Sequence, residues 1–230
     1  MFEGFSGRTV DFLWGIRFNN ERDWFEANKR SYLNDLQRPM KALAQDVYDT
    51  VRKASPGRDL TCRVSRIYRD ARRLRGRGPY KDGLWFTLER SKENWTQEPV
   101  FWFELKPEGY TYGMGFYAAP PLTMAKLRAR IDRDPKPMEK LVRDFQKQSV
   151  FTLDGENYRR PKGNPSPLLA PWYQKKSFSL LCTRTQDELL FRRELLDHVS
   201  EGFSFLMPYY DYIIRLEGDP DPRLPKEPHE

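Results

Sequence analysis

The residues of this chain best suited to hold an anion lie between positions 66 and 81, in the stretch RIYRDARRLRGRGPYK. Arg and Lys side chains crowd this stretch around a single carboxylate, that of Asp70. In an extended segment alternate side chains point the same way, so Arg66 and Arg72 would flank Asp70. A guanidinium beside a carboxylate keeps it ionised and aligned, and its free edge binds a phosphate or carboxylate group through two hydrogen bonds.

Three interpretations of this stretch stay open. The arginines and Asp70 form a structural ion-pair network, or they bind an anion, or Asp70 acts as a catalytic general base.

Two neighbouring loops extend this candidate site. The loop GRGPYKDG, residues 76–83, places three glycines around Tyr80 and Lys81, so backbone N–H groups would approach an anion while Lys81 adds a positive charge. A second basic loop, YRRPKGNPSP at 158–167, precedes QKKSF. The structural alternatives are an ordinary hairpin loop for residues 76–83 and a solvated loop for residues 158–167. If the two basic segments fold side by side, they would close one anion-binding cleft. The predicted ligand-binding residues are Arg66, Arg69, Arg72, Tyr80, Lys81, Arg160, Lys162 and Lys176.

The positive charge of the chain is concentrated in one segment. The 40 Lys and Arg residues outnumber the 33 Asp and Glu residues, and residues 52–81 alone carry eleven basic and two acidic side chains. Such a local excess indicates an anionic partner, which we expect to be a phosphorylated or carboxylated small molecule. One alternative is a nucleic-acid-binding module that uses the same patch, because strand aromatics beside basic residues also stack single-stranded bases. A further alternative is an adaptor without ligand chemistry.

The sequence lacks the residues that several classes of chemistry require. Cys62 and Cys182 are isolated and His198 is the one histidine outside the tail, so we expect no metal site and no cofactor. The GxSxG and Walker A patterns are absent. Whether the protein is an enzyme stays open, as does its oligomeric state. No apolar run has the length of a membrane span or resembles a signal peptide, so we expect a cytoplasmic protein without a membrane partner.

Hydrophobic periodicity predicts the elements that position these residues. Pro39 must break or restart the second helix, and short turns make the first four strands an antiparallel meander. The expected helices span 9–18, 20–38, 40–54, 121–131, 135–148 and 185–205, followed by an aromatic segment after Pro208. The expected strands span 62–70, 84–90, 100–106, 110–117 and 176–184.

This pattern predicts the α+β class. We expect a single domain over residues 1–216, with a mainly antiparallel sheet covered by N- and C-terminal helices. The tail, residues 217–230, is acidic and rich in proline, and we expect it to be disordered.

Four blocks of the sequence occur in a familiar order. They are NNERDWFEANK, then RIYRDARR with GPYK, then GFYAAP followed by LRARI, then RRPKG followed by KKSF. Over roughly residues 5–215 the chain resembles the bacterial family named domain of unknown function 2461, a family of uncharacterised conserved hypothetical proteins. The resemblance implies a single α+β domain and no particular activity.

The chain departs from this family pattern in its central block. Similar sequences tend to read Arg-Phe-Ser-x-Asp-Lys between the Arg-Asp pair and Pro-Tyr-Lys, whereas Arg73, Leu74, Arg75, Gly76 and Arg77 stand here. An aromatic and an acidic side chain are lost and positive charge is gained. If that acid takes part in chemistry in relatives, the resemblance implies that this member binds without catalysing.

Overall fold

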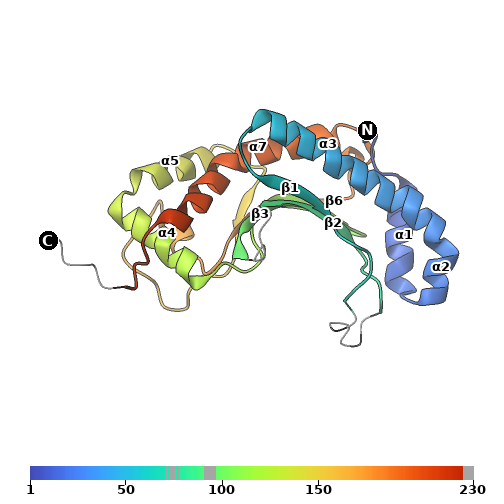
Figure 1. Ribbon diagram of the computed structural model, residues 1–230, viewed down its shortest axis with the longest axis horizontal. Coiled ribbons are helices and arrows are strands. Elements are labelled where there is room, and N and C mark those ends of the chain that lie inside the picture. The colour runs from blue at the N-terminus through green and yellow to red at the C-terminus, as the bar shows by residue number, and fades with distance from the viewer. Residues whose placement is uncertain (71, 73–75, 77, 91–96, 225–230) are drawn as a thin grey trace. The chain divides into compact units, whose positions relative to one another are not determined.

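The computed structural model describes residues 1–70, 72, 76, 78–90 and 97–224 (Figure 1). The helical elements are α1 (Gly7–Phe18), α2 (Arg22–Ser31), the π-helical η1 (Tyr32–Gln37), α3 (Arg38–Ala54), α4 (Pro121–Arg133), α5 (Lys136–Phe145), α6 (Ala170–Tyr173), η4 (Glu188–Phe191), α7 (Leu195–Ile214) and η5 (Arg215–Gly218). The strands are β1 (Leu60–Val64), β2 (Leu84–Arg90), β3 (Pro99–Lys106), β4 (Gly109–Phe116), β5 (Thr152–Asp154) and β6 (Ser179–Thr185).

The six strands form one antiparallel sheet in the order β1-β2-β3-β4-β6-β5. Phe86 of β2 lies opposite Val64 of β1 and Phe103 of β3, which fixes the register of the first three strands. The predicted meander and the predicted returning strand are both present. The α+β class and the single α+β domain are therefore confirmed.

Within this domain the residues group into two compact units. Unit 1 comprises Met1–Ser91, Phe101–Tyr112 and Thr183–Ser204, and unit 2 comprises Lys92–Val100, Gly113–Cys182 and Phe205–Glu230. Each unit is described by itself below.

In unit 1, α3 packs on β1 and β2 through one apolar stripe. Met40, Leu43 and Val47 are fully buried, and their spacing of three and four residues places them on one helical face. Pro39 stands in the first turn of α3, where its missing N–H needs no partner, and the predicted restart of the helix takes the form of the preceding π-helical turn. Figure 1 shows α3 along one face of the sheet.

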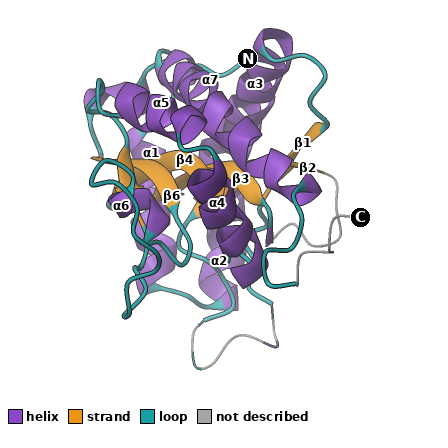
Figure 2. Ribbon diagram, turned by 90° about the vertical axis from the view of Figure 1, so that its left-hand side faces the viewer, coloured by secondary structure: helices purple, strands orange, loops and turns teal. Residues whose placement is uncertain are grey.

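Unit 2 is held together by stacked aromatic rings. Trp172 of α6 stacks on Tyr209 of α7 at 6.0 Å between ring centroids, and Phe145 of α5 contacts both rings edge-on. The Tyr209 hydroxyl donates to the Leu141 carbonyl at 2.9 Å, which ties α7 to α5. Figure 2 shows the helices and strands of the chain by type. None of the helices in the described ranges is long and apolar enough to cross a membrane.

The predicted bounds of the first strand and of the last helix are wrong. The first strand ends at Val64 instead of residue 70, for a reason given with the site below. The last helix starts at Leu195 and runs through Pro208 to Ile214, whereas the sequence suggested a separate segment after the proline. Although Pro208 deprives the helix of a hydrogen bond, its neighbours Met207 and Tyr209 are buried, and their burial keeps the helix continuous. The short β5 and α6 were not predicted.

The first residues of the predicted tail are held against α4 by Arg130. Its Nε donates to Asp219 Oδ2 at 2.6 Å, and its two terminal nitrogens donate to the carbonyls of Tyr212 and Arg215 at 3.1 and 2.8 Å. Leu216 is buried. The chain therefore stays docked at least to Asp219. The domain boundary at residue 216 stays a prediction, and residues 225–230 lie outside the described part of the chain.

We expect Asp219→Asn to lower the free energy of unfolding by about 1–3 kcal/mol, the usual worth of a charged hydrogen bond. The hydrogen bond and charge of Arg130 hold the pKa of Asp219 below its ordinary value. Its contribution is therefore present above about pH 4 and is lost as the pH falls through the folded-state pKa. Urea unfolding at pH 7 and at pH 3 measures both effects.

Asp221→Asn is the matched control, because Asp221 pairs with Arg223 two residues along the chain. We expect this variant to unfold like the wild type. Equal losses in the two variants would show that Asp219 has no special role.

Candidate functional site

The stretch between β1 and β2 is an irregular hairpin, which explains the early end of β1. The regular pairing stops at Val64 opposite Phe86, and a single bridge between Tyr68 and Tyr80 follows. Between these two points residues 65–67 face residues 81–85, so the two arms have unequal lengths and the ladder cannot continue. Alternation along an extended strand therefore does not govern residues 66–70, so it does not support placing Arg66 and Arg72 on one face beside Asp70.

Asn20, at the end of α1, fixes the far part of this hairpin. Its side-chain amide accepts from the Tyr80 N–H at 2.9 Å and donates to the Tyr80 carbonyl at 3.0 Å, much as a neighbouring strand would. It also donates to the Ile16 carbonyl at 3.1 Å. Asn20 fills the space that a Cβ on Gly78 would need, so glycine at this position permits the close approach. The sequence reasoning missed Asn20.

Asp82 joins the hairpin to α1 through two arginines. Arg17 Nε lies 2.7 Å from Asp82 Oδ2, and Arg69 Nη2 lies 3.5 Å from Oδ1. Arg17 also pairs with Glu108 in the β3–β4 turn. Burial alone would raise the pKa of Asp82, but the hydrogen bond and charge of Arg17, with the charge of Arg69, hold it below its ordinary value. Arg69 further donates to the Tyr80 carbonyl at 2.6 Å, so it acts as a brace of the hairpin.

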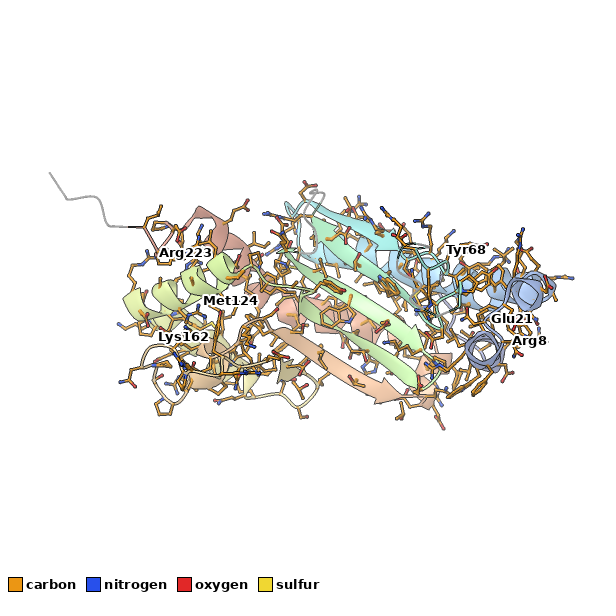
Figure 3. The ribbon with its side chains drawn as sticks, turned by 90° about the horizontal axis from the view of Figure 1, so that it is seen from below. Arg8, Glu21, Tyr68, Met124, Lys162 and Arg223 are labelled. Atoms are coloured by element: carbon orange, nitrogen blue, oxygen red, sulfur yellow. The ribbon has the colours of Figure 1, made fainter. Side chains whose placement is uncertain are left out.

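Tyr80 is a core residue of unit 1. Its ring stacks on Phe25 of α2 at 4.2 Å between centroids and lies 5.4 Å from the ring of Tyr68. The side chain is 3% exposed, and burial raises its pKa. Tyr68, labelled in Figure 3, covers this cluster with half of its surface exposed.

Asp70 and Arg72 pair with one another at the exposed end of the hairpin. Arg72 donates from its backbone N–H and from Nε to Asp70 Oδ1, both at 3.0 Å, and from Nη2 to Oδ2 at 2.8 Å. The Arg72 side chain is 88% exposed. This geometry matches the structural ion-pair interpretation, and a general-base role of Asp70 stays an untested prediction.

Lys81 has the opposite environment, because positive groups surround it. Its ammonium donates to the Arg66 carbonyl and lies 4.2 Å from the centre of the Trp85 ring. Burial lowers the pKa of Lys81, and the charges of Arg66 and Arg69 lower it further. Among the residues that the structure describes, no carboxylate pairs with Lys81 or Arg66. We call Lys81, Arg66 and Arg69 the Lys81 cluster.

Trp85 belongs to a face of the sheet that the helices of unit 1 leave open. Figure 3, seen from below, shows these strands with no described helix of unit 1 in front of them. Trp85 and Trp102 are half-buried there, whereas their neighbours Phe86, Phe101 and Phe103 are fully buried on the face that α3 covers. The strand aromatics, which the sequence allowed as a stacking platform, thus divide between the buried core and this open face.

Glu89 is a further residue of this open face that the sequence reasoning missed. It is 3% exposed, accepts from the Thr87 hydroxyl at 2.8 Å and lies 3.2 Å from Arg63 Nε. Alternation along β2 places Trp85, Thr87 and Glu89 on the same side. We call Arg63, Trp85, Thr87, Glu89 and Trp102 the open face. A buried acid within a strand is hard to foresee, since alternation alone cannot say which face is covered.

The second basic segment belongs to unit 2. Lys176 pairs with Glu156 at 3.0 Å, and Arg160 is exposed without an ion pair in the described ranges. Lys162, labelled in Figure 3, lies over the ring of Tyr158 at 5.2 Å. Of the predicted ligand-binding residues, Arg66, Arg69 and Lys81 come together in unit 1, whereas Arg160, Lys162 and Lys176 belong to unit 2. Convergence of the two basic segments in one cleft stays a prediction.

The described parts of the chain hold no metal cluster, and the Cys62 thiol is not activated. No three His, Cys, Asp or Glu residues gather there as metal ligands. Burial raises the pKa of the Cys62 thiol to about 11, and the charges of Asp49 and Glu89 add to this, so the thiol stays protonated near neutral pH.

We expect Asn20→Ala to lower the free energy of unfolding by about 1–3 kcal/mol, because it leaves the N–H of a buried residue, Tyr80, without its partner. Asn19→Ala is the matched control, since the Asn19 amide donates only to the Gly15 carbonyl at an exposed site. Urea unfolding compares the two variants. Similar losses would show that the tie to Tyr80 contributes nothing.

We expect Arg17→Gln to move the acid unfolding of the protein to higher pH. In the wild type the pKa values of Asp82 and Glu108 are lowered, so their contribution to stability is lost only as the pH falls below about 4. Without Arg17 the burial of Asp82 raises its pKa, and protonation begins earlier. Unfolding measured between pH 3 and pH 7 tests this, with Arg8→Gln, an exposed arginine of the same helix, as the control; coincident acid limbs would contradict it.

Comparison with known proteins identifies the family of this chain. No curated protein is similar enough to this chain to count as a match. A family model described as a conserved hypothetical protein, domain of unknown function 2461, matches residues 8–212. This match includes the hairpin, the Asn20 tie, the open face and the basic segment of unit 2. With most of its 230 residues covered, the chain belongs to the domain of unknown function 2461 family.

Proposed function

We propose that the protein binds a small molecule carrying a phosphate or carboxylate group, with this group at Lys81 and Arg66 and the rest of the ligand against the open face. The observation that carries the proposal is the half-buried ammonium of Lys81, which lies over Trp85 without a carboxylate partner among the described residues. The function stays a proposal for this member of its family.

Electrostatics favours an anion at the Lys81 cluster. Burial, and then the positive charges of Arg66 and Arg69, lower the pKa of Lys81, which means that its protonated form is destabilised in the unliganded protein. A bound anion would reverse this effect and accept hydrogen bonds from the donors that Lys81 and Arg66 still have free. Charged hydrogen bonds of this kind are worth about 1.5–3 kcal/mol each when partly shielded from water.

The open face supplies an apolar surface for the remainder of the ligand. Trp85 lies opposite Glu104 and Trp102 opposite Thr87, so the two indoles are diagonal neighbours on the same side of β2 and β3. Diagonal neighbours are about 7–8 Å apart, close enough for one flat ligand to contact both. Thr87 and Glu89, on the same side, are buried and hydrogen-bond to one another, so the two indoles form the accessible apolar part of this surface.

The other predicted ligand-binding residues of the hairpin have supporting roles in this proposal. Arg69 positions Tyr80 and Asp82, the ring of Tyr80 packs on Phe25, and Arg72 is paired with Asp70. We therefore assign direct contact to Lys81 and Arg66 and a positioning role to Arg69.

Nucleic acid remains the alternative occupant of the basic hairpin, and salt distinguishes it. Binding of single-stranded nucleic acid loses affinity with a slope of about −0.7 in log salt for each phosphate contact, so several contacts give a steep dependence. One small anion gives a shallow one. A steep slope with an oligonucleotide would replace the small-molecule proposal.

Phenyl phosphate and benzoate serve as probes, with the indole N–H signal of Trp85 in the NMR spectrum as the readout. We expect both to shift this signal in the wild type, and Lys81→Gln to weaken the binding at least tenfold. Arg72→Gln is the matched control, because it removes an equal charge from the same hairpin at an exposed, paired side chain. Undiminished binding by Lys81→Gln would refute the proposal.

We also expect the affinity for these probes to fall as the pH rises through the pKa of Lys81, which lies below its usual value. An anion binds the protonated amine, so binding takes up a proton wherever free Lys81 is partly deprotonated. In Lys81→Gln this dependence should be absent. Titrations between pH 7 and pH 10 measure it.

A further inference from the structure

Unit 2 contains a tyrosine ring with two cations over it. The guanidinium of Arg128 in α4 lies 5.0 Å from the centre of the Tyr158 ring, and the ammonium of Lys162 lies 5.2 Å from it. We propose that Arg128 and Lys162 form a second anion site, which binds the phosphate group of a phosphomonoester or of inorganic phosphate. This proposal does not depend on the Lys81 cluster, which belongs to unit 1.

The unsatisfied donor of Arg128 carries the proposal. Its Nη1 is buried and has no hydrogen-bond partner among the residues that the structure describes. Arg130, two residues further on α4, shows the contrast, because each of its three nitrogens donates to an oxygen of the chain. Buried polar groups in folded proteins are almost always hydrogen-bonded, so an unpaired guanidinium nitrogen points to a ligand that the chain does not supply. Arginine beside a lysine is well suited to a phosphate dianion.

The loop that brings Tyr158 and Lys162 to Arg128 is held in place by Gln174. The Gln174 side chain accepts from the Lys162 N–H and donates to the Lys162 carbonyl, both at 2.8 Å. The Gln174 carbonyl accepts from the Tyr158 N–H at 2.9 Å. Gly163 has a φ of +53°, and the Tyr173 hydroxyl fills the space that a side chain there would need. The site is therefore preorganised, which lowers the entropy cost of binding.

The charged and titratable neighbours of Arg128 are compatible with an anion. Asp132, one turn along α4, accepts a hydrogen bond from the Tyr173 hydroxyl at 2.9 Å and forms no ion pair with Arg128. Burial and then the Asp132 hydrogen bond raise the pKa of Tyr173 to about 12, although the charge of Arg128 opposes this. Tyr173 thus stays neutral and partly shields the Asp132 charge, while Lys162 contributes a second positive charge.

The test uses inorganic phosphate as the probe and the Lys81→Gln variant as the parent protein. The result then does not depend on whether the Lys81 cluster of the wild type binds phosphate. The melting temperature is measured against phosphate concentration, with chloride holding the ionic strength constant. We expect a saturable rise in the parent. Adding Arg128→Gln should raise the dissociation constant at least tenfold, while Arg143→Gln, an exposed arginine of α5, should leave it unchanged.

Lys162→Gln changes only an exposed side chain, so it tests the site even if Arg128→Gln does not fold. We expect it to weaken phosphate binding several-fold, and we expect acetate, a monoanion, to bind more weakly than phosphate. Undiminished phosphate binding in Arg128→Gln or Lys162→Gln would overturn the proposal. So would a parent that shows no saturable response, or one that binds acetate and phosphate equally.

Discussion

The hairpin between β1 and β2 depends on one side chain, the amide of Asn20. Where the sheet hydrogen bonds stop, this amide replaces a neighbouring strand by pairing with both backbone groups of Tyr80. The tie holds the Tyr80 ring on Phe25 and leaves the next residue, Lys81, directed over Trp85. Asp82, between Arg17 and Arg69, adds a second tie next to it. The position of the Lys81 ammonium is thus a consequence of contacts made one residue to either side.

Much of the fold was predictable because its signals are local. The stripe of Met40, Leu43 and Val47 identifies α3, and short turns between β-rich runs identify the meander. The errors arise where tertiary contacts prevail over local preference. Pro208 ends a helix in sequence terms, yet burial on either side carries α7 past it. The strand that was expected to reach residue 70 stops at Val64, because the two arms of the hairpin differ in length, which alternation cannot reveal.

The concentration of positive charge in the sequence indicated where the candidate site lies. It did not show which of the arginines are available to a ligand. A count of arginines treats Arg66, Arg69 and Arg72 alike, whereas their partners differ: Arg69 braces a carbonyl and Asp82, Arg72 pairs with Asp70, and Arg66 has no carboxylate in the described ranges. The same holds on α4, where Arg128 and Arg130 look equivalent in sequence and only one is satisfied by the chain. Whether a positive charge is available to a ligand depends on its neighbours in space.

The unequal arms of the hairpin connect the position of the Lys81 ammonium to the core, because each arm contains a fully buried apolar side chain, Ile67 in the shorter arm and Leu84 in the longer. Residues 65–67 face residues 81–85 between two fixed pairings. Loss of two residues from the longer arm would let the ladder continue and would carry the lysine away from the indole. Gain of two would extend the bulge and move the ammonium along the strand. Insertions and deletions in steps of two, rather than point substitutions, are therefore the changes that would move the Lys81 ammonium relative to Trp85.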